Sequence, residues 1–167
     1  MASTGTINSS DYEHLVTKYR THNNGELRMK DVGKTVTLIG WVQVIRDLNH
    51  FVFIVLRDRY GYTQIIFNNP EDSSSEKGQK QLANYKIAQT IGREFVVQVT
   101  GTVIERSNKT KKYKTGDIEI DVDTLIVLNQ SKTPPFKIED DTDGLEDIRM
   151  KFRFLDIRRS KVREALI

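Results

Sequence analysis

Residues 36–67 predict the first half of a β-sheet, and they read VTLIGWVQVIRDLNHFVFIVLRDRYGYTQIIF. β-Branched and aromatic residues dominate three runs of this stretch, which suits a pleated and half-buried surface. We therefore expect strands at 36–42, 51–56 and 62–67. Asp47 to His50 and the segment closed by Gly61 predict tight turns, because Asn and Gly tolerate left-handed backbone conformations. Strands joined by such short turns pair antiparallel, so the three predict a meander.

The rest of the chain adds one helix and two strands. Residues 68–79 are polar and predict a loop, and 80–91 have helical spacing, with Gly92 as the stop. The apolar positions expected to share most of one helix face are Leu82, Tyr85, Ile87 and Ile91. Strands follow at 95–100, continuing past Gly101, and at 118–127. This order is that of an all-β, five-stranded Greek-key OB-fold with one helix. An SH3-like barrel or a split sheet fits the same order.

The two flanks of the barrel differ from it in composition. Residues 1–22 predict a poorly ordered polar leader, which leaves 23–130 as the barrel domain. Residues 131–167 predict a hinge, because Pro134 and Pro135 stiffen the chain before an acidic stretch. Apolar residues then recur at helical spacing with nothing evident to cover them, at Leu145, Ile148, Phe152 and Leu155. We expect this helix to begin a further domain that is absent from the chain.

Composition excludes several classes of site and of protein. The 167 residues include no cysteine, so no disulfide, thiol nucleophile or Cys-based zinc site is possible. The three histidines have no metal-ligand spacing, and no apolar run is long enough to span a membrane. Net charge is only +3, but four lysines cluster in one predicted loop, at Lys109, Lys111, Lys112 and Lys114. Such a patch is compatible with a nucleic-acid partner and equally with a solvated surface.

Residues 51–57 are the first candidate for a binding surface. Side chains alternate between faces along a strand, so Val52, Ile54 and Leu56 are expected inside the barrel. The outer set is then Phe51, Phe53, Val55 and Arg57. An outward Phe53 near Gln64 of the next strand forms a base-stacking platform beside a hydrogen-bonding amide. The alternative is that Phe51 and Phe53 pack under the N-terminal segment.

Several short motifs, in one order and spacing, resemble those of bacterial-type aspartyl-tRNA synthetases, which are class II aminoacyl-tRNA synthetases. They cover the chain from about Tyr19 to its end. They are 19–22 (YRTH), 25–28 (GELR), 40–42 (GWV) with Arg46-Asp47, then Phe53, 56–59 (LRDR), Gly61 and Gln64. The series continues with 99–103 (VTGTV), 115–119 (TGDIE), 133–136 (TPPF) and 149–159 (RMKFRFLDIRR). The family usually has more arginines before Asp47 and a glycine pair where this chain has Asn49-His50.

The resemblance implies an N-terminal domain that binds a tRNA anticodon, with a role for each matching residue. Phe53 matches the aromatic residue that stacks on an anticodon base. Gln64 and Glu119 match residues that hydrogen-bond base edges, and Arg46 and Arg106 match arginines that contact the anticodon loop. Taken from the residues alone, Glu119 is equally an exposed strand residue and Arg106 a solvated charge at the rim.

The resemblance also implies the partners and the setting. The partner is the anticodon stem-loop of the aspartate tRNA, in a cytoplasmic protein. The parent enzyme is expected to use ATP and magnesium and to dimerise through its catalytic domain. The chain itself is expected to hold no catalytic residue, metal or cofactor. Two other readings stay open: a single-stranded nucleic-acid-binding OB protein that acts alone, and the same domain of an asparaginyl- or lysyl-tRNA synthetase.

Overall fold

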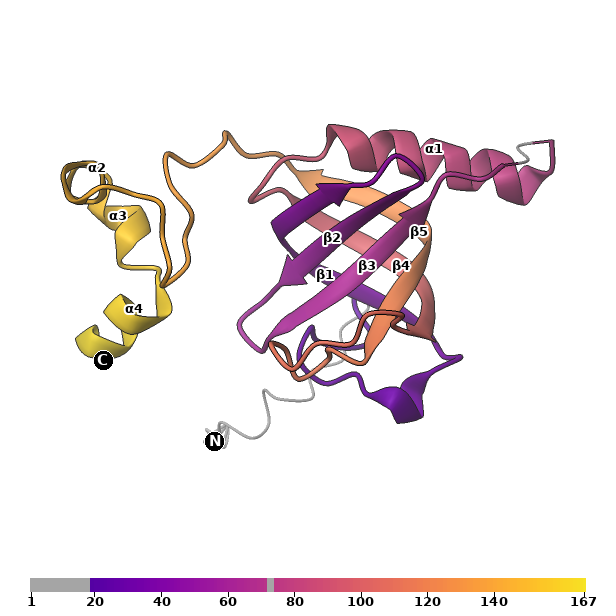
Figure 1. The fold of residues 1–167 in the computed structure, drawn as a ribbon, viewed down its shortest axis with the longest axis horizontal. Coiled ribbons are helices and arrows are strands. Elements are labelled where there is room, and N and C mark those ends of the chain that lie inside the picture. Colours follow the sequence, from indigo (N-terminus) through magenta and orange to yellow (C-terminus); the bar gives the residue numbers. More distant parts are fainter. Residues whose placement is uncertain (1–18, 72–73) are drawn as a thin grey trace, which may run out of the picture. The chain divides into compact units, whose positions relative to one another are not determined.

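The computed structural model describes residues 19–71 and 74–167, and its centre is a closed barrel of five strands (Figure 1). The strands are β1 (Thr35–Asp47), β2 (Phe51–Arg57), β3 (Tyr62–Asn68), β4 (Val96–Glu105) and β5 (Ile118–Asn129). Their order around the barrel is β1-β2-β3-β5-β4, and every pair is antiparallel except β3 with β5. The predicted five-stranded OB-fold is therefore confirmed, and a split sheet is excluded because the sheet closes.

Strand β1 is long enough to join the two halves of the barrel. Its first half, Thr35 to Trp41, pairs with β4, and its second half, Trp41 to Asp47, pairs with β2. The register shifts between Val42 and Val44, and a bulge of this kind bends a strand and increases its twist. The bend allows one strand to serve both neighbours, which closes the barrel.

The predicted alternation along β2 is confirmed at the three inward positions. Val52, Ile54 and Leu56 have no solvent exposure and belong to the hydrophobic core of the barrel. Val55 does not belong to this core, which agrees with its predicted place on the outer face, but it is nevertheless buried. Its cross-strand neighbours Val44 and Gln64 flank it on both sides and shield it from solvent.

Helix α1 (Glu76–Thr90) starts four residues earlier than predicted, because Ser75 caps it: the Ser75 hydroxyl accepts a hydrogen bond of 3.0 Å from the Gly78 amide. Tyr85 and Ala88 are buried and join the barrel core. The prediction that Ile87 lies on the same face is wrong, because its side chain is 41% exposed. Two positions along a helix are about 200° apart, so Ile87 cannot share the face of Tyr85.

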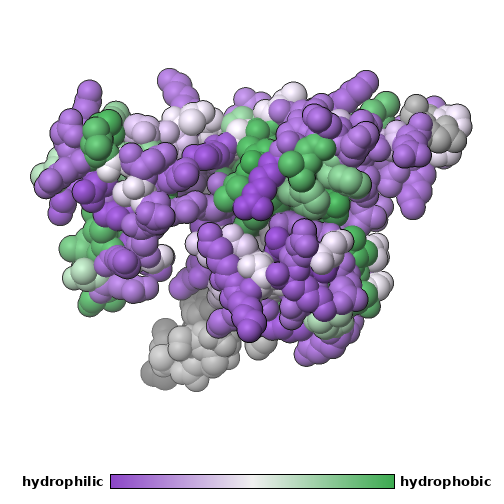
Figure 2. Space-filling view, in the orientation of Figure 1, coloured by the Kyte–Doolittle hydropathy of each residue, from purple (hydrophilic) through white to green (hydrophobic). Residues whose placement is uncertain are grey.

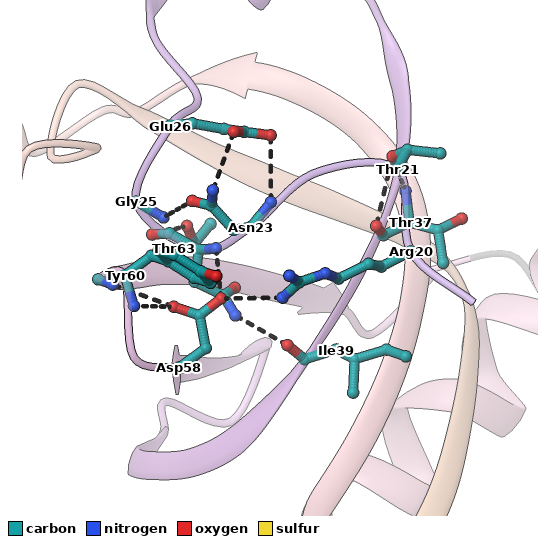
Figure 3. A network of polar contacts seen from close by, with 12 residues as sticks. Arg20, Thr21, Asn23, Gly25, Glu26, Thr37, Ile39, Asp58, Tyr60 and Thr63 are labelled. Atoms are coloured by element: carbon teal, nitrogen blue, oxygen red, sulfur yellow. Dashed lines mark hydrogen bonds and ion pairs between the residues drawn. The ribbon is translucent and has the colours of Figure 1, made fainter. Parts of the chain in front are cut away.

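The N-terminal segment that the structure describes is bound to the barrel. Arg20 forms an ion pair with Asp58 at 3.6 Å, and the Thr21 amide donates to the Thr37 carbonyl at 2.9 Å (Figure 3). The expected poor order therefore does not extend to residues 19–22, and the leader to residue 18 lies outside the described residues. Asp58 also accepts hydrogen bonds from the amides of Asn24, Tyr60 and Gly61.

This network explains why the motifs around 19–28 and 56–61 occur together. They make one structure, in which the N-terminal segment is attached to the β2–β3 turn. A Cβ atom on Gly25 would lie 2.3 Å from the Tyr60 carbonyl oxygen, so only glycine permits this approach. These motifs therefore stabilise the fold.

Residues 132–167 form a second compact unit, distinct from the barrel unit that ends at Ser131. The prediction of a single helix in this segment is wrong. The structure has three short helices, α2 (Glu146–Lys151), α3 (Arg153–Asp156) and α4 (Ser160–Leu166). The helical path breaks at Phe152, whose ψ of 44° is not helical. Among the described residues, no helix is long and apolar enough to cross a membrane.

Candidate nucleic-acid interface

A pocket of about 290 Å³ lies on the outer face of the barrel, between the β1–β2 turn and the β4–β5 loop. All five residues predicted from the sequence line it. The full lining, which we call the first pocket, is Arg46, Leu48, Phe51, Phe53, Gln64, Ile66, Arg106, Ser107, Asn108 and Glu119. Figure 2 shows hydrophobic side chains gathered on the barrel below α1, with strongly hydrophilic ones between them.

The aromatic wall of the first pocket comes from β2. Phe53 lies opposite Arg46 of β1 and Ile66 of β3 in the sheet register, so the three form one row across the outer face. The ring of Phe51 lies 6.1 Å from that of Phe53, tilted by 37°. Phe51 is 42% exposed and Phe53 is half-buried, so both rings remain accessible on the surface of the sheet.

The polar floor of the pocket is a pair formed by Gln64 of β3 and Glu119 of β5. The Gln64 side-chain amide donates a hydrogen bond of 2.7 Å to a carboxylate oxygen of Glu119. Both side chains are buried, which contradicts the reading of Glu119 as an exposed strand residue. This bond uses one donor and one carboxylate oxygen. Over residues 19–71 and 74–167 no other hydrogen bond engages either side chain, so further donors and acceptors remain for a ligand.

Two arginines at the pocket carry positive charge that the protein does not neutralise. Within the described chain, no carboxylate lies within 4.0 Å of the guanidinium of Arg46 or Arg106. The Nε of Arg106 is buried, and none of the residues that the structure describes accepts a hydrogen bond from it. A buried donor without an acceptor costs stability in the free protein, so the site is better satisfied with an anionic or acceptor-bearing ligand in place.

The turn that bounds the pocket is held in shape by its own backbone and by α1. Asn49 has a φ of 64°, the left-handed conformation that asparagine tolerates, as the turn prediction required. The Tyr85 hydroxyl donates a hydrogen bond of 2.7 Å to the Asn49 carbonyl. Gln89 donates to the Asp47 carboxylate at 3.0 Å, so two α1 side chains hold the turn next to Leu48.

Four of the ten lining residues, namely Leu48, Ile66, Ser107 and Asn108, were not among the side chains expected on this face. Ile66 lies two positions after Gln64 on the same strand, so period-two alternation would have placed it on this face. Leu48, Ser107 and Asn108 belong to loops, where no periodicity reports the direction of a side chain. In the described part of the chain, no group of three His, Cys, Asp or Glu residues could hold a metal ion.

An exposed aromatic surface, a buried amide–carboxylate pair and two unneutralised arginines together suit a splayed base and its phosphate. Residues 36–128 match the family model described as an OB-fold nucleic acid binding domain. The chain belongs to this family. The match covers all five strands to within one residue at either end, and it excludes the SH3-like alternative.

Sequence relatives of this OB-fold domain are aspartate–tRNA ligases, which confirms the resemblance seen in the motifs. The chain is 53% identical over 149 residues to the enzyme of Flavobacterium psychrophilum, and 53% over 148 residues to that of Phocaeicola vulgatus. Each match covers 89% of this chain and 24% of the relative. The chain thus spans about a quarter of the length of the curated relatives it matches.

Solved structures show the same architecture. Aspartyl-tRNA synthetase from Entamoeba histolytica aligns with a TM-score of 0.65 at 24% identity, covering 80% of this chain and 31% of that one. Asparaginyl-tRNA synthetase from Pyrococcus horikoshii aligns with a TM-score of 0.60 at 25% identity, covering 81% and 28%. Sequence identity this low supports the fold alone. A function for this chain therefore has to be inferred from the residues of the first pocket.

Proposed function

We propose that this chain is the part of an aspartate–tRNA ligase that reads the anticodon loop of the aspartate tRNA. One observation carries the proposal: the five residues named from the sequence line a single pocket. They come from β1, β2, β3, β5 and the β4–β5 loop, so chain proximity alone does not explain their meeting.

Each group has a chemical task in this proposal. Phe53 stacks on one base, which any base permits. Gln64 and Glu119 exchange part of their mutual hydrogen bonding for contacts to the edges of unstacked bases, a carboxylate accepting from an exocyclic amine. Arg46 and Arg106 bind phosphate oxygens, and Arg106 thereby satisfies its buried Nε–H.

The wider setting is part of the same proposal. The whole protein joins aspartate to its tRNA in the cytoplasm, using ATP and magnesium, and forms a homodimer through its catalytic domain. The support is 53% identity to proteins named aspartate–tRNA ligase. The chemistry belongs to the three-quarters of the relatives' length outside the match, so we assign no catalytic residue to this chain.

The test measures affinity for RNA stem-loops that differ only in the anticodon. The unaltered chain is expected to prefer the aspartate anticodon over single-base changes by ~1–3 kcal/mol each. Gln64→Ala is expected to remove most of that preference at one position. It should also lower the melting temperature, because the buried Glu119 carboxylate loses its hydrogen bond, so affinities are compared at a temperature where both proteins are folded. Gln79→Ala removes an equivalent amide from the exposed surface of α1, and it serves as the matched control.

Stem-loops with the asparagine anticodon distinguish the remaining readings. An asparaginyl-type domain would prefer that loop, and a general single-strand-binding protein would bind every loop alike. Equal affinity for all loops, unchanged by Gln64→Ala, would refute anticodon reading while leaving nucleic-acid binding in place.

A further inference from the structure

A second pocket, of about 190 Å³, is lined by Gly25, Tyr60, Gly61, Tyr62, Lys112, Tyr113 and Lys114. It lies where the β2–β3 turn meets the β4–β5 loop. The first pocket contains no residue of this set, so the two sites are built separately. Its walls are aromatic and its rim is basic.

The aromatic wall is packed from two segments of the chain. The rings of Tyr62 and Tyr113 stack with centroids 5.1 Å apart and an angle of 29° between their planes. The guanidinium groups of Arg20 and Arg59 lie 5.5 and 5.6 Å from the centroid of the Tyr60 ring. Cations over ring faces stabilise the position of the Tyr60 side chain.

Most lysines of the basic rim form no ion pair with a described residue. Lys109 is paired with Glu105 at 2.6 Å, and this hydrogen bond and charge raise the pKa of Lys109. Lys111, Lys112 and Lys114 are exposed, and no carboxylate within the described ranges lies within 4.0 Å of their amines. Lys112 instead lies 5.7 Å from the centroid of the Tyr113 ring. Three ammonium groups are therefore available to an anionic partner.

The loop that carries these lysines has a defined conformation. The Thr110 amide donates to the Gly116 carbonyl at 3.0 Å, and the Gly116 amide donates to the Tyr113 carbonyl at 3.0 Å. The buried Thr115 hydroxyl donates to the carbonyl of Tyr62 on β3. These bonds fix the backbone of the loop against the barrel, so a ligand binds without first ordering the loop.

The same loop also lines the first pocket, through Arg106, Ser107 and Asn108. A continuous run of nine residues, 106–114, therefore connects the two pockets. A chain of phosphates leaving the first pocket along this loop meets the three lysines next. We propose that the second pocket binds the backbone phosphates of the RNA segment that adjoins the bases held in the first pocket. The proposal rests on the proposed function, because it takes its partner from there.

Salt dependence measures such contacts directly. Binding of the anticodon stem-loop is measured between 50 and 300 mM salt for the parent chain and for the double variant Lys112→Ala/Lys114→Ala. Removal of two phosphate-binding lysines is expected to reduce the slope of log affinity against log salt by about 2 and to weaken every anticodon variant equally. The control is Lys80→Ala/Lys86→Ala, which removes the same charge from α1, a helix that lines neither pocket.

Two RNA probes identify the source of the phosphates. A single-stranded heptanucleotide with the loop sequence lacks the stem, so a loss confined to the stem-loop assigns the contact to stem phosphates. An equal loss for both probes assigns it to the loop strand, and either result supports the proposal. A double variant that behaves like the α1 control, while the parent chain binds RNA, overturns it and leaves the proposed function standing. If the parent chain binds neither probe, the proposed function itself is refuted, and the proposal for the second pocket falls with it.

Discussion

Phe53 separates binding from folding at the scale of one residue. Its ring lies on the outer face of β2 at the first pocket, whereas Ile54, the next residue, is fully buried in the core. Phe53→Ala is therefore expected to cost ~1–3 kcal/mol of affinity for an anticodon stem-loop, the usual worth of one stacked base. Its melting temperature should change little. Fluorescence anisotropy and a thermal melt on the same preparation check both expectations.

Ile54→Ala is the matched control for that substitution. Loss of a buried isoleucine side chain typically costs ~2–5 kcal/mol of stability, so this variant should melt well below the parent. The fraction that remains folded should bind RNA with nearly unchanged affinity. If Phe53→Ala lost stability and kept its affinity, the ring would be a packing residue and not a stacking platform.

Asp121 gives a prediction about pH. Burial and the neighbouring Asp123 raise the pKa of Asp121 above its ordinary value of 3.8, and Lys77 offsets this only in part. An acid whose pKa is raised by folding binds protons more readily in the native state, so stability falls as pH rises from the ordinary pKa through the raised one. The penalty is complete above that window. Asp121→Asn should thus raise the melting temperature at pH 7.

The difference between Asp121→Asn and the parent should shrink as pH falls through the raised pKa and below 3.8, because the parent carboxyl is then protonated in both the folded and the unfolded state. The substitution preserves an acceptor for the hydrogen bond of 3.0 Å that Asn68 donates. Thermal melts from pH 3.5 to 7.5 follow the effect. A variant that gained nothing at pH 7 would show that the Asn68 and Lys77 contacts compensate fully for burial.

At this scale, the sequence predicted which side chains point outward but not which of them pair. Period-two alternation placed Phe53 correctly, because it depends only on the geometry of one strand. The bond between Gln64 and Glu119 joins residues 55 positions apart, so it depends on the closure of β3 against β5. Alternation also placed Val55 on the outer face, but it did not predict that Val55 is buried there between neighbours on two other strands.

Helix α1 contributes to the site through the β1–β2 turn. Tyr85→Phe removes the hydroxyl that donates to the Asn49 carbonyl and keeps the ring in the core. We expect a loss of stability of about 1 kcal/mol, the usual net worth of such a bond, and a severalfold loss of RNA affinity because the turn next to Leu48 loosens. A melt and a binding isotherm measure the two losses.

Ile87→Ala provides the comparison within the same helix, since Ile87 is exposed and does not line the first pocket. It should leave affinity unchanged. An equal loss of affinity in both variants would mean that helix stability, and not the hydrogen bond to Asn49, controls the site. The sequence predicted the existence of α1 from its periodicity, but the link to the turn spans 36 residues and has no local signal.

At the scale of the molecule, the element order predicted the barrel, while the C-terminal part was predicted only in outline. Residues 132–167 have apolar positions at helical spacing, yet the chain breaks at Phe152 because local periodicity does not report where a helix bends. Several large apolar side chains of this unit stay exposed, including Leu145, Met150, Phe154 and Leu166. Of the predicted helical stripe, Leu145 is exposed and Ile148, Phe152 and Leu155 are half-buried.

The core of the barrel draws on residues between Leu27 and Val127, and among the described residues none of 132–167 belongs to it. The helices of the second unit have only six, four and seven residues, which is too short to be stable without tertiary packing. We therefore expect the second unit to be less stable than the barrel.

Native-state hydrogen exchange measures this difference. Amides of β1, β4 and β5 should exchange only through global unfolding, and amides of α2 to α4 should exchange orders of magnitude faster. A chain ending at Ser131 should keep the denaturant midpoint and the RNA affinity of the longer one. Equal protection in both units, or a clear fall in midpoint on truncation, would instead make the second unit part of one cooperative fold.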